Sequence, residues 1–101
     1  MIVKNVIISE EAKADIEAAK AFYGSKEIGI GDYFIDCILS DLESLSFFAG
    51  IHIKEHGYFR MLSKKFPFAI YYEVTDTLAI VVAILDMRRN PTWLNVQLDM
   101  R

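Results

Sequence analysis

Residues 58–86 read YFRMLSKKFPFAIYYEVTDTLAIVVAILD, and this stretch decides the fold. It contains three segments rich in β-branched and aromatic residues, at 58–63, 68–74 and 78–85, a composition typical of strands. Residues 64–67 and 75–77 separate these segments and are of the types that form hairpin connections. Pro67 stands at the start of the middle strand, where its missing N–H does least harm. The stretch predicts an antiparallel meander.

Residues 2–26 predict a strand followed by a helix. The strand, 2–8, is rich in β-branched residues and ends at Ser9, a good N-cap whose followers Glu10 and Glu11 suit the first turn of a helix. The helix shows apolar residues at helical spacing, and Gly24 could end it. Its apolar positions are Ala12, Ile16, Ala19 and Phe22 or Tyr23.

A second, longer helix is predicted to extend to about Phe48, after a glycine-containing turn at 28–31. Two amphipathic helices joined by a short turn form an αα-hairpin. The chain of 101 residues is one domain, 1–101. We therefore predict an α+β fold of the plan β-α-α-β-β-β, with an antiparallel sheet and the αα-hairpin packed on one face. The stripe of the second helix is Ile30, Phe34, Ile38, Leu42 and Leu45.

Two of the predicted strands are apolar on both faces, because residues 68–72 and 78–85 do not alternate. One αα-hairpin covers only one side of an antiparallel sheet, so something else must cover the other. The segment after Pro91, with Trp93, Leu94, Val96 and Leu98, could fold back over part of it. A protein partner or a second copy could supply the remainder. The alternative is a tightly rolled sheet that hides both faces internally.

The composition limits the kinds of partner and compartment. The net charge is −3, which argues against a broad nucleic-acid-binding surface. The charge is unevenly distributed, at −5 over residues 1–50 and +2 over residues 51–101. The longest apolar run, 78–85, is far shorter than the roughly 20 residues of a membrane span. With no signal-peptide pattern and a lone Cys37, we expect a cytoplasmic protein that does not associate with membranes.

Three groups of motifs resemble one known family. Residues 59–74, FRMLSKKFPFAIYYEV, are similar to the pattern R-x-L-x-x-R/K-F-P-Y-x-I-Y-Y of the RelE/ParE toxin superfamily. Residues 83–91, AILDMRRNP, with Trp93, resemble its V-L-H-x-R-R-D-P and following Trp. Upstream, residues 12–16, 22–23 and 29–34 resemble its helix pair and its G-L-G-x-x-F link. The resemblance covers nearly the whole chain.

This resemblance implies the toxin of a type II toxin–antitoxin system, a ParE-like plasmid stabilisation protein held inactive by a cognate antitoxin. ParE-like members poison DNA gyrase without a hydrolytic site, whereas RelE-like members cut mRNA on the ribosome. A toxin fold that has lost its activity is a third reading. The resemblance implies no cofactor and no metal, and a homodimer is an option when the antitoxin is absent.

The side chains suited to each activity can be named. Metal-independent RNA cleavage needs proton-transfer groups and cations for the phosphorane charge. Asp86 stands where relatives often carry His, which weakens the nuclease reading, so we favour the gyrase-directed reading. Arg60 should either pair with Glu73 or face a ligand, and His52 and His56 should be surface histidines. The nuclease candidates are Arg60, Tyr72, Arg88 and Arg89; the candidates for target or antitoxin contact are Arg60, Lys64, Lys65, Tyr71, Arg88, Arg89 and Trp93.

Overall fold

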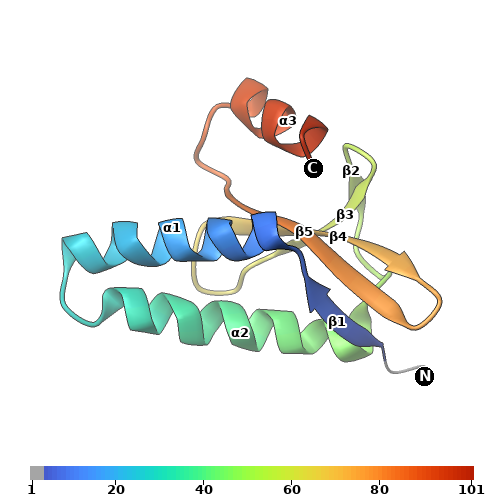
Figure 1. The fold of residues 1–101 in the computed structure, drawn as a ribbon, viewed down its shortest axis with the longest axis horizontal. Helices are drawn as coiled ribbons and strands as arrows, with labels where there is room; N and C mark the ends of the chain where they lie inside the picture. The colour runs from blue at the N-terminus through green and yellow to red at the C-terminus, as the bar shows by residue number, and fades with distance from the viewer. Residues whose placement is uncertain (1–3) are drawn as a thin grey trace.

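The computed structural model describes residues 4–101, so the first residues of the predicted opening strand lie outside the described part. Figure 1 shows a helix pair, a twisted sheet and a short C-terminal helix. The elements in chain order are β1 (Asn5–Ile8), α1 (Glu10–Lys26), α2 (Ile30–Phe48), β2 (Lys54–Glu55), β3 (Tyr58–Leu62), β4 (Phe68–Thr75), β5 (Leu78–Asp86) and α3 (Pro91–Asp99). The predicted α+β plan is confirmed.

The sheet has five strands in the order β1-β5-β4-β3-β2. Strands β3, β4 and β5 form the predicted antiparallel meander. The prediction of a wholly antiparallel sheet is wrong, because β1 pairs with β5 in parallel and makes the sheet mixed. The register between β4 and β5 shifts at Tyr71/Tyr72, as at a bulge. Strand β2 was not predicted, because it has only two residues and both are exposed, which leaves no alternating pattern to detect.

The predicted start of α1 is confirmed, but its predicted end is wrong. The Ser9 Oγ accepts a hydrogen bond from the Ala12 N–H at 3.1 Å, which confirms the N-cap. The prediction that Gly24 ends α1 is wrong, because the helix continues to Lys26. Gly31 allows the two helices to approach closely, since a Cβ there would lie 2.7 Å from the Lys20 carbonyl oxygen.

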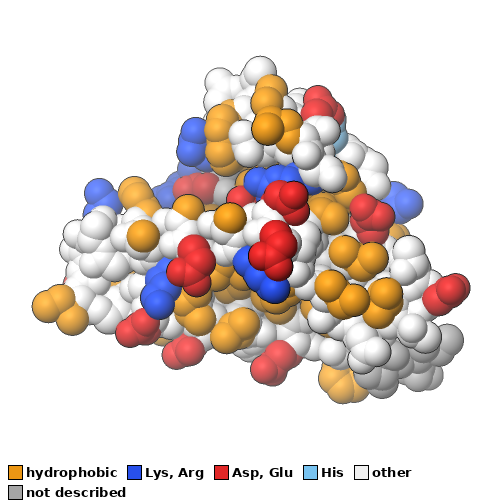
Figure 2. All heavy atoms as spheres, viewed as in Figure 1, with side chains coloured by type: hydrophobic (Ala, Val, Ile, Leu, Met, Phe, Trp, Pro, Cys, Tyr) orange, Lys and Arg blue, Asp and Glu red, His pale blue; other side chains and the backbone are white. Residues whose placement is uncertain are grey.

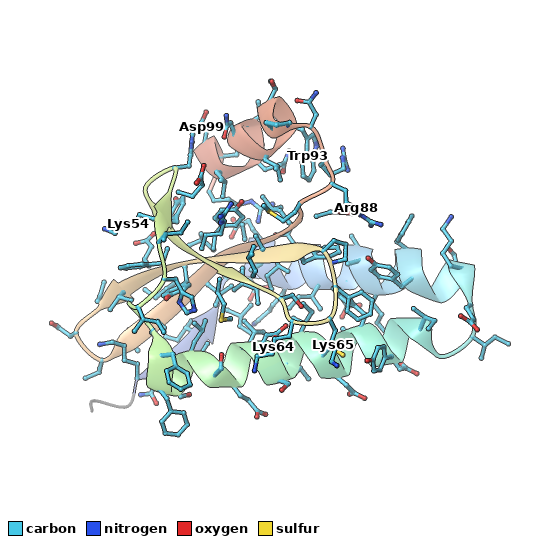
Figure 3. All side chains as sticks on the ribbon, turned by 180° about the vertical axis from the view of Figure 1, so that it is seen from behind. Lys54, Lys64, Lys65, Arg88, Trp93 and Asp99 are labelled. Carbon is cyan, nitrogen blue, oxygen red and sulfur yellow. The ribbon has the colours of Figure 1, made fainter. Side chains whose placement is uncertain are left out.

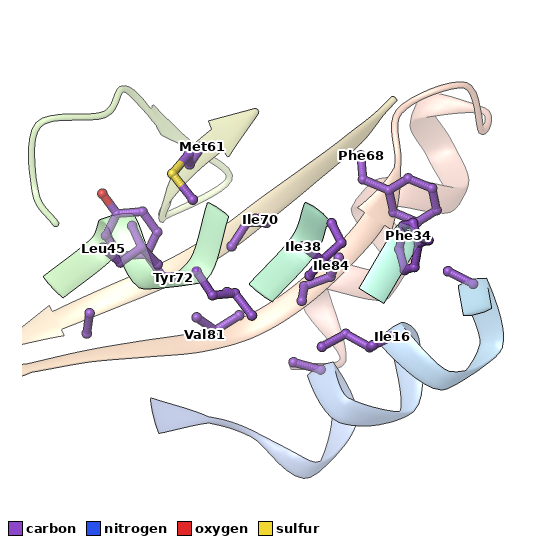
Figure 4. Packing of buried hydrophobic residues seen from close by; sticks show 14 residues of the cluster. Ile16, Phe34, Ile38, Leu45, Met61, Phe68, Ile70, Tyr72, Val81 and Ile84 are labelled. Atoms are coloured by element: carbon purple, nitrogen blue, oxygen red, sulfur yellow. The ribbon is translucent and has the colours of Figure 1, made fainter. Parts of the chain in front are cut away.

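One hydrophobic core lies between the helix pair and the sheet (Figure 4). The predicted stripe of α2 faces it, with Phe34, Ile38, Leu42 and Leu45 all buried. Burying one such side chain is worth about 1.5–3 kcal/mol, so this layer supplies much of the stability. The strand residues in this core are Met61, Phe68, Ile70, Tyr72, Ala79, Val81 and Ile84.

A second core forms on the opposite face of the sheet, under α3 (Figure 1). The Asn90 side chain caps this helix by accepting the Thr92 N–H at 2.7 Å, and Pro91 begins it, as helix N-termini favour. Leu94 and Leu98 then pack on the sheet. The expectation that the tail folds back over the second face is confirmed. The strand residues that it covers, Ala69, Tyr71, Val82, Ala83 and Leu85, are at most 7% exposed.

A buried ion pair fastens α3 to α1. The Arg101 guanidinium donates to the two carboxylate oxygens of Asp15 at 2.6 and 3.0 Å and to the Val82 carbonyl at 3.1 Å. The Asp15 Oδ2 also accepts the Ile84 N–H at 2.9 Å. The hydrogen bond to Asp15 raises the pKa of Arg101 although burial opposes it. These two side chains thereby provide hydrogen-bond partners for the Val82 carbonyl and the Ile84 N–H of β5, which lie past the last residue that pairs with β1.

The exposed apolar surface lies elsewhere than the sequence predicted. The outer face of the central strands is closed by α3 and needs no partner. Large hydrophobic side chains are exposed instead near the end of α2 and the edge of β3, where Phe48, Ile51 and Leu62 are 47%, 72% and 57% exposed. No helix within residues 4–101 has the length and apolar character of a membrane span.

Candidate functional site

Three predicted contact residues meet where β5 leads into α3. Arg88 and Arg89 follow the end of β5, and Trp93 lies in the first turns of α3. Figure 3 shows Arg88 and Trp93 projecting near each other at this junction. Because Arg and Trp are the residues most enriched among energetically dominant interface contacts, we treat this junction as the main candidate site.

Arg88 is held in place by Asp86. Its Nε and Nη2 donate to the two Asp86 carboxylate oxygens at 3.0 and 2.7 Å, and Nη2 lies 3.4 Å from the Tyr23 hydroxyl on α1. The hydrogen bond from Arg88 lowers the pKa of Asp86 below its ordinary value, and the same bond raises the pKa of Arg88. Asp86 therefore orients a permanent cation and does not serve as an acid or base near neutral pH.

Arg89 stacks on Trp93, with its guanidinium carbon 3.8 Å from the ring centroid. Such cation–π stacking fixes the guanidinium while leaving its edge free to donate hydrogen bonds. Beside this pair lies an apolar pocket of about 400 Å³ between α1, the ends of the central strands and α3. Its lining is Asp15, Ala18, Ala19, Phe22, Phe68, Ile84, Leu85, Asp86, Arg89 and Trp93. The junction is thus suited to accept an apolar side chain beside Arg89 and Trp93.

The other cationic candidates lie on β3 and the turn that follows it. Lys64 and Lys65 are exposed in that turn, which passes close to α2 in Figure 3. Arg60 is paired across the strands with Tyr71, and its Nε is buried without a hydrogen-bond partner. Among residues 4–101 Arg60 forms no ion pair with Glu73. A buried, unpaired N–H costs about 1–3 kcal/mol, so the burial of this atom opposes the stability of the fold.

Tyr71 lies under α3 and is only 2% exposed. Its hydroxyl is 3.8 Å from the Met87 sulfur, a weak acceptor. Burial raises the pKa of Tyr71, and the Arg60 charge opposes that shift. Tyr71 is therefore inaccessible as a contact residue while α3 is in place.

Tyr72 belongs to the helix-side core and organises the loop after α2. Its hydroxyl accepts the Gly50 N–H at 2.9 Å and lies 2.5 Å from His52 Nδ1. Burial raises the pKa of Tyr72 and lowers the pKa of His52. The prediction of surface histidines is wrong for His52, which is half-buried by this contact, whereas His56 is exposed as expected and lies 2.5 Å from an Asp99 carboxylate oxygen. Both contacts join distant segments, so no local sequence signal could have revealed them.

The four nuclease candidates are not brought together. Tyr72 faces the helix pair and is fully buried, whereas Arg60 shares the opposite face of the sheet with Tyr71, as cross-strand partners do. Arg88 and Arg89 lie at the far end of β5. Because general acid–base catalysis needs groups within hydrogen-bond reach of one reacting atom, this arrangement does not assemble a single hydrolytic centre.

The surface charges suit a protein partner better than a polyanion. On the face shown in Figure 2, acidic and basic side chains are interspersed over the helices, with hydrophobic ones between them. Affinity for nucleic acid rests on many Lys and Arg contacts to phosphates. No group of three or more His, Cys, Asp or Glu side chains placed to hold a metal occurs within residues 4–101.

Comparisons with known proteins agree with the fold. A family model described as the ParE toxin of the type II toxin–antitoxin system parDE matches residues 6–91. A solved structure titled "Chromosomal ParDE TA system from P. aeruginosa" is similar with a TM-score of 0.67 at 14% identity, covering 83% of this chain and 96% of that one. Comparison with curated proteins gave no significant match. At this identity the solved structure supports the shared fold, and the family model supports membership.

Proposed function

Since the chain belongs to the ParE toxin family of type II toxin–antitoxin systems, we propose that it inhibits DNA gyrase by binding it, and that a cognate antitoxin prevents this. The observation that carries the proposal is the β5–α3 junction. It presents an apolar pocket beside a stacked Arg89–Trp93 pair and a fixed Arg88, features of a protein-binding surface. The dispersal of the nuclease candidates over both faces of the sheet supports binding over hydrolysis.

Inhibition of purified gyrase tests this proposal directly. We expect the toxin to block DNA supercoiling and the antitoxin to restore it. Arg89→Ala should raise the concentration for half-inhibition about 10- to 30-fold, because removing an interface arginine typically costs about 2 kcal/mol. Lys13→Ala, at an exposed lysine of α1 that does not line the pocket, is the matched control and should act like the natural chain.

Expression in cells distinguishes the alternatives. Filamentation with DNA damage supports gyrase as the target, cleaved messages with arrested translation indicate a RelE-like ribosome-dependent endoribonuclease, and normal growth indicates a fold without activity. Replacing Arg60 or Arg88 with Ala should leave a gyrase inhibitor partly active and abolish a nuclease. Equal loss of both activities would contradict this division of roles.

Two further expectations belong to the same proposal. A gyrase inhibitor acts in the cytoplasm, where fractionation should find it. The toxin without its antitoxin is expected to form homodimers, because it exposes Phe48, Ile51 and Leu62 and exposed apolar surface favours association. Sedimentation of the free toxin and of its complex with the antitoxin measures this.

A further inference from the structure

The pocket at the β5–α3 junction is large enough for an aromatic ring. Its volume is about 400 Å³, within the range of about 300–1,000 Å³ usual for ligand pockets. From α1 it is lined by Ala18 and Ala19, whose side chains end at Cβ and leave the space open. Phe22, Phe68 and Trp93 form aromatic walls, and aromatic rings pack well against one another edge to face or offset. The cavity therefore favours an aromatic occupant over a polar one.

The two carboxylates that line this pocket already have cationic partners. Asp15 binds Arg101 through both oxygens and also accepts the Ile84 N–H. Asp86 binds Arg88 through both oxygens and also accepts the Arg88 N–H at 2.9 Å. Because each acid has a guanidinium of its own, the opposite charges of each pair largely cancel for a ligand that approaches from solvent. The pocket is therefore not suited to a cationic ligand.

Arg89 supplies the charge of the pocket that has no anionic partner. Within residues 4–101 its guanidinium forms no ion pair, and both oxygens of the nearby Asp86 already bind Arg88. Its face is stacked on Trp93 at 3.8 Å, which leaves the N–H groups of its edge to donate outward. An exposed guanidinium edge binds a carboxylate through two parallel hydrogen bonds. An unpaired positive charge thus stands beside an apolar cavity.

We propose that this pocket binds an aromatic side chain of gyrase together with a neighbouring Asp or Glu of gyrase, the ring entering the cavity and the carboxylate binding the edge of Arg89. The inference rests on the proposed function, since it takes gyrase as the protein bound at this junction. It adds the chemistry that the toxin recognises there. Charge complementarity gives the preference for an acidic segment, because among the charged residues that line the pocket in the described part of the chain only Arg89 is unpaired.

Small probes test the pocket without gyrase. Hydrocinnamate carries a phenyl ring and a carboxylate, and hydrocinnamyl alcohol has the same ring without the charge. Both should shift the NMR signal of the indole N–H of Trp93, the only tryptophan of the chain, and hydrocinnamate should bind about 10-fold more tightly. This factor is at the low end for a hydrogen bond between charged groups, because Arg89 is exposed.

Substitutions assign the binding of the probes to the cavity and to the cation. Ala18→Leu places a larger side chain in the pocket and should abolish saturable binding of both probes. Ala14→Leu, at an exposed alanine of the same helix that does not line the pocket, is the matched control and should bind both probes like the natural chain. Arg89→Gln removes the charge and should make the two probes bind equally. Thermal unfolding of each variant checks that it folds.

The supercoiling assay asks whether gyrase uses the same pocket. Ala18→Leu should raise the concentration for half-inhibition about 10-fold or more, while Ala14→Leu should act like the natural chain. Saturating hydrocinnamate should relieve inhibition by the natural chain, and gyrase with hydrocinnamate alone checks that the probe leaves the enzyme active. Arg89→Glu should lose more inhibition than Arg89→Gln, because the new carboxylate would face the carboxylate of gyrase and repel it.

The outcomes separate this inference from the proposed function. Probe binding that depends on Ala18 and Arg89, with a matching loss of gyrase inhibition, supports it. Absence of a saturable shift of the Trp93 signal, full gyrase inhibition by Ala18→Leu, or equal inhibition by Arg89→Glu and Arg89→Gln would overturn it and leave gyrase as the target.

Two results would move the pocket or the function elsewhere. Loss of antitoxin binding in Ala18→Leu, with gyrase inhibition unchanged, would overturn the inference by assigning the pocket to the antitoxin. A natural chain that does not inhibit gyrase would overturn the proposed function, and with it gyrase as the source of the occupant, even if hydrocinnamate binds beside Arg89.

Discussion

Removing the Arg101 side chain should release α3 from the sheet before the rest of the chain unfolds. Arg101 and Asp15 are 10% and 15% exposed at their side chains, so their pair belongs with buried ion pairs. Taking away one partner of such a pair costs about 3–5 kcal/mol, because the other charge stays buried without compensation. Asp15 keeps the Ile84 N–H as a donor, so we expect about 3 kcal/mol for Arg101→Ala.

Local and global effects can be separated because Trp93 is the only tryptophan and lies in α3. Urea unfolding of Arg101→Ala should show the Trp93 fluorescence change at lower urea than the loss of far-ultraviolet circular dichroism. In the natural chain the two transitions should coincide, as expected for a small two-state domain. Arg101→Lys keeps the charge but not the two-pronged geometry, and should fall between the two.

A double-mutant cycle of Arg101→Ala with Asp15→Ala measures the coupling free energy of this ion pair. If the pair holds α3, the two substitutions should couple by about 1.5 kcal/mol or more, within the range for residues in one network. Coupling near zero, with a loss of less than about 0.5 kcal/mol for Arg101→Ala, would place the pair with ordinary surface salt bridges and refute the reasoning.

Other substitutions test the packing. Gly31→Ala should lower the free energy of unfolding by about 1–3 kcal/mol, since its Cβ would meet the Lys20 carbonyl at 2.7 Å. Gly24→Ala, with open space in a helix interior, should raise it by about 0.5–1 kcal/mol. Urea unfolding measures both, and changes of the same sign would contradict the close crossing of the two helices. Tyr72→Phe removes the acceptor for a backbone N–H and should cost about 1–3 kcal/mol, seen as a lower Tm. Burial lowers the pKa of His52 from its usual 6.5, so the unfolded chain binds the proton more readily than the folded one. The free energy of unfolding should therefore fall as the pH drops from 7 toward 5. His52→Asn should flatten this pH dependence, and an unchanged slope would show that His52 is not its cause.

Local patterns were enough to predict the elements. The meander, the Ser9 cap and the stripe of α2 depend on residues close together in sequence, and all are present. The failures have local causes too. Gly24 weakens a helix without necessarily ending it, and α1 continues to Lys26. Strand β2 is too short to carry a pattern.

The candidate site was predictable only in part. Arg88, Arg89 and Trp93 follow one another in sequence, so their meeting at the junction follows from the strand end and the cap. The pocket beside them could not be foreseen, because Phe22 and Ala18 reach it from α1. Among the nuclease candidates named from the sequence, Arg60 and Tyr72 lie on opposite faces of the sheet, a separation that depends on how the strands pair.

By itself the sequence determined β1, the helix pair, the three-stranded meander and the need to cover a second apolar face, because these depend on periodicity and on the total apolar surface. Only the tertiary structure decided what covers that face. The reason is that hydrogen bonds such as Asp15 to Ile84 and Arg101 to Val82 join residues remote in sequence. Their partners are chosen by packing, which local sequence patterns do not encode.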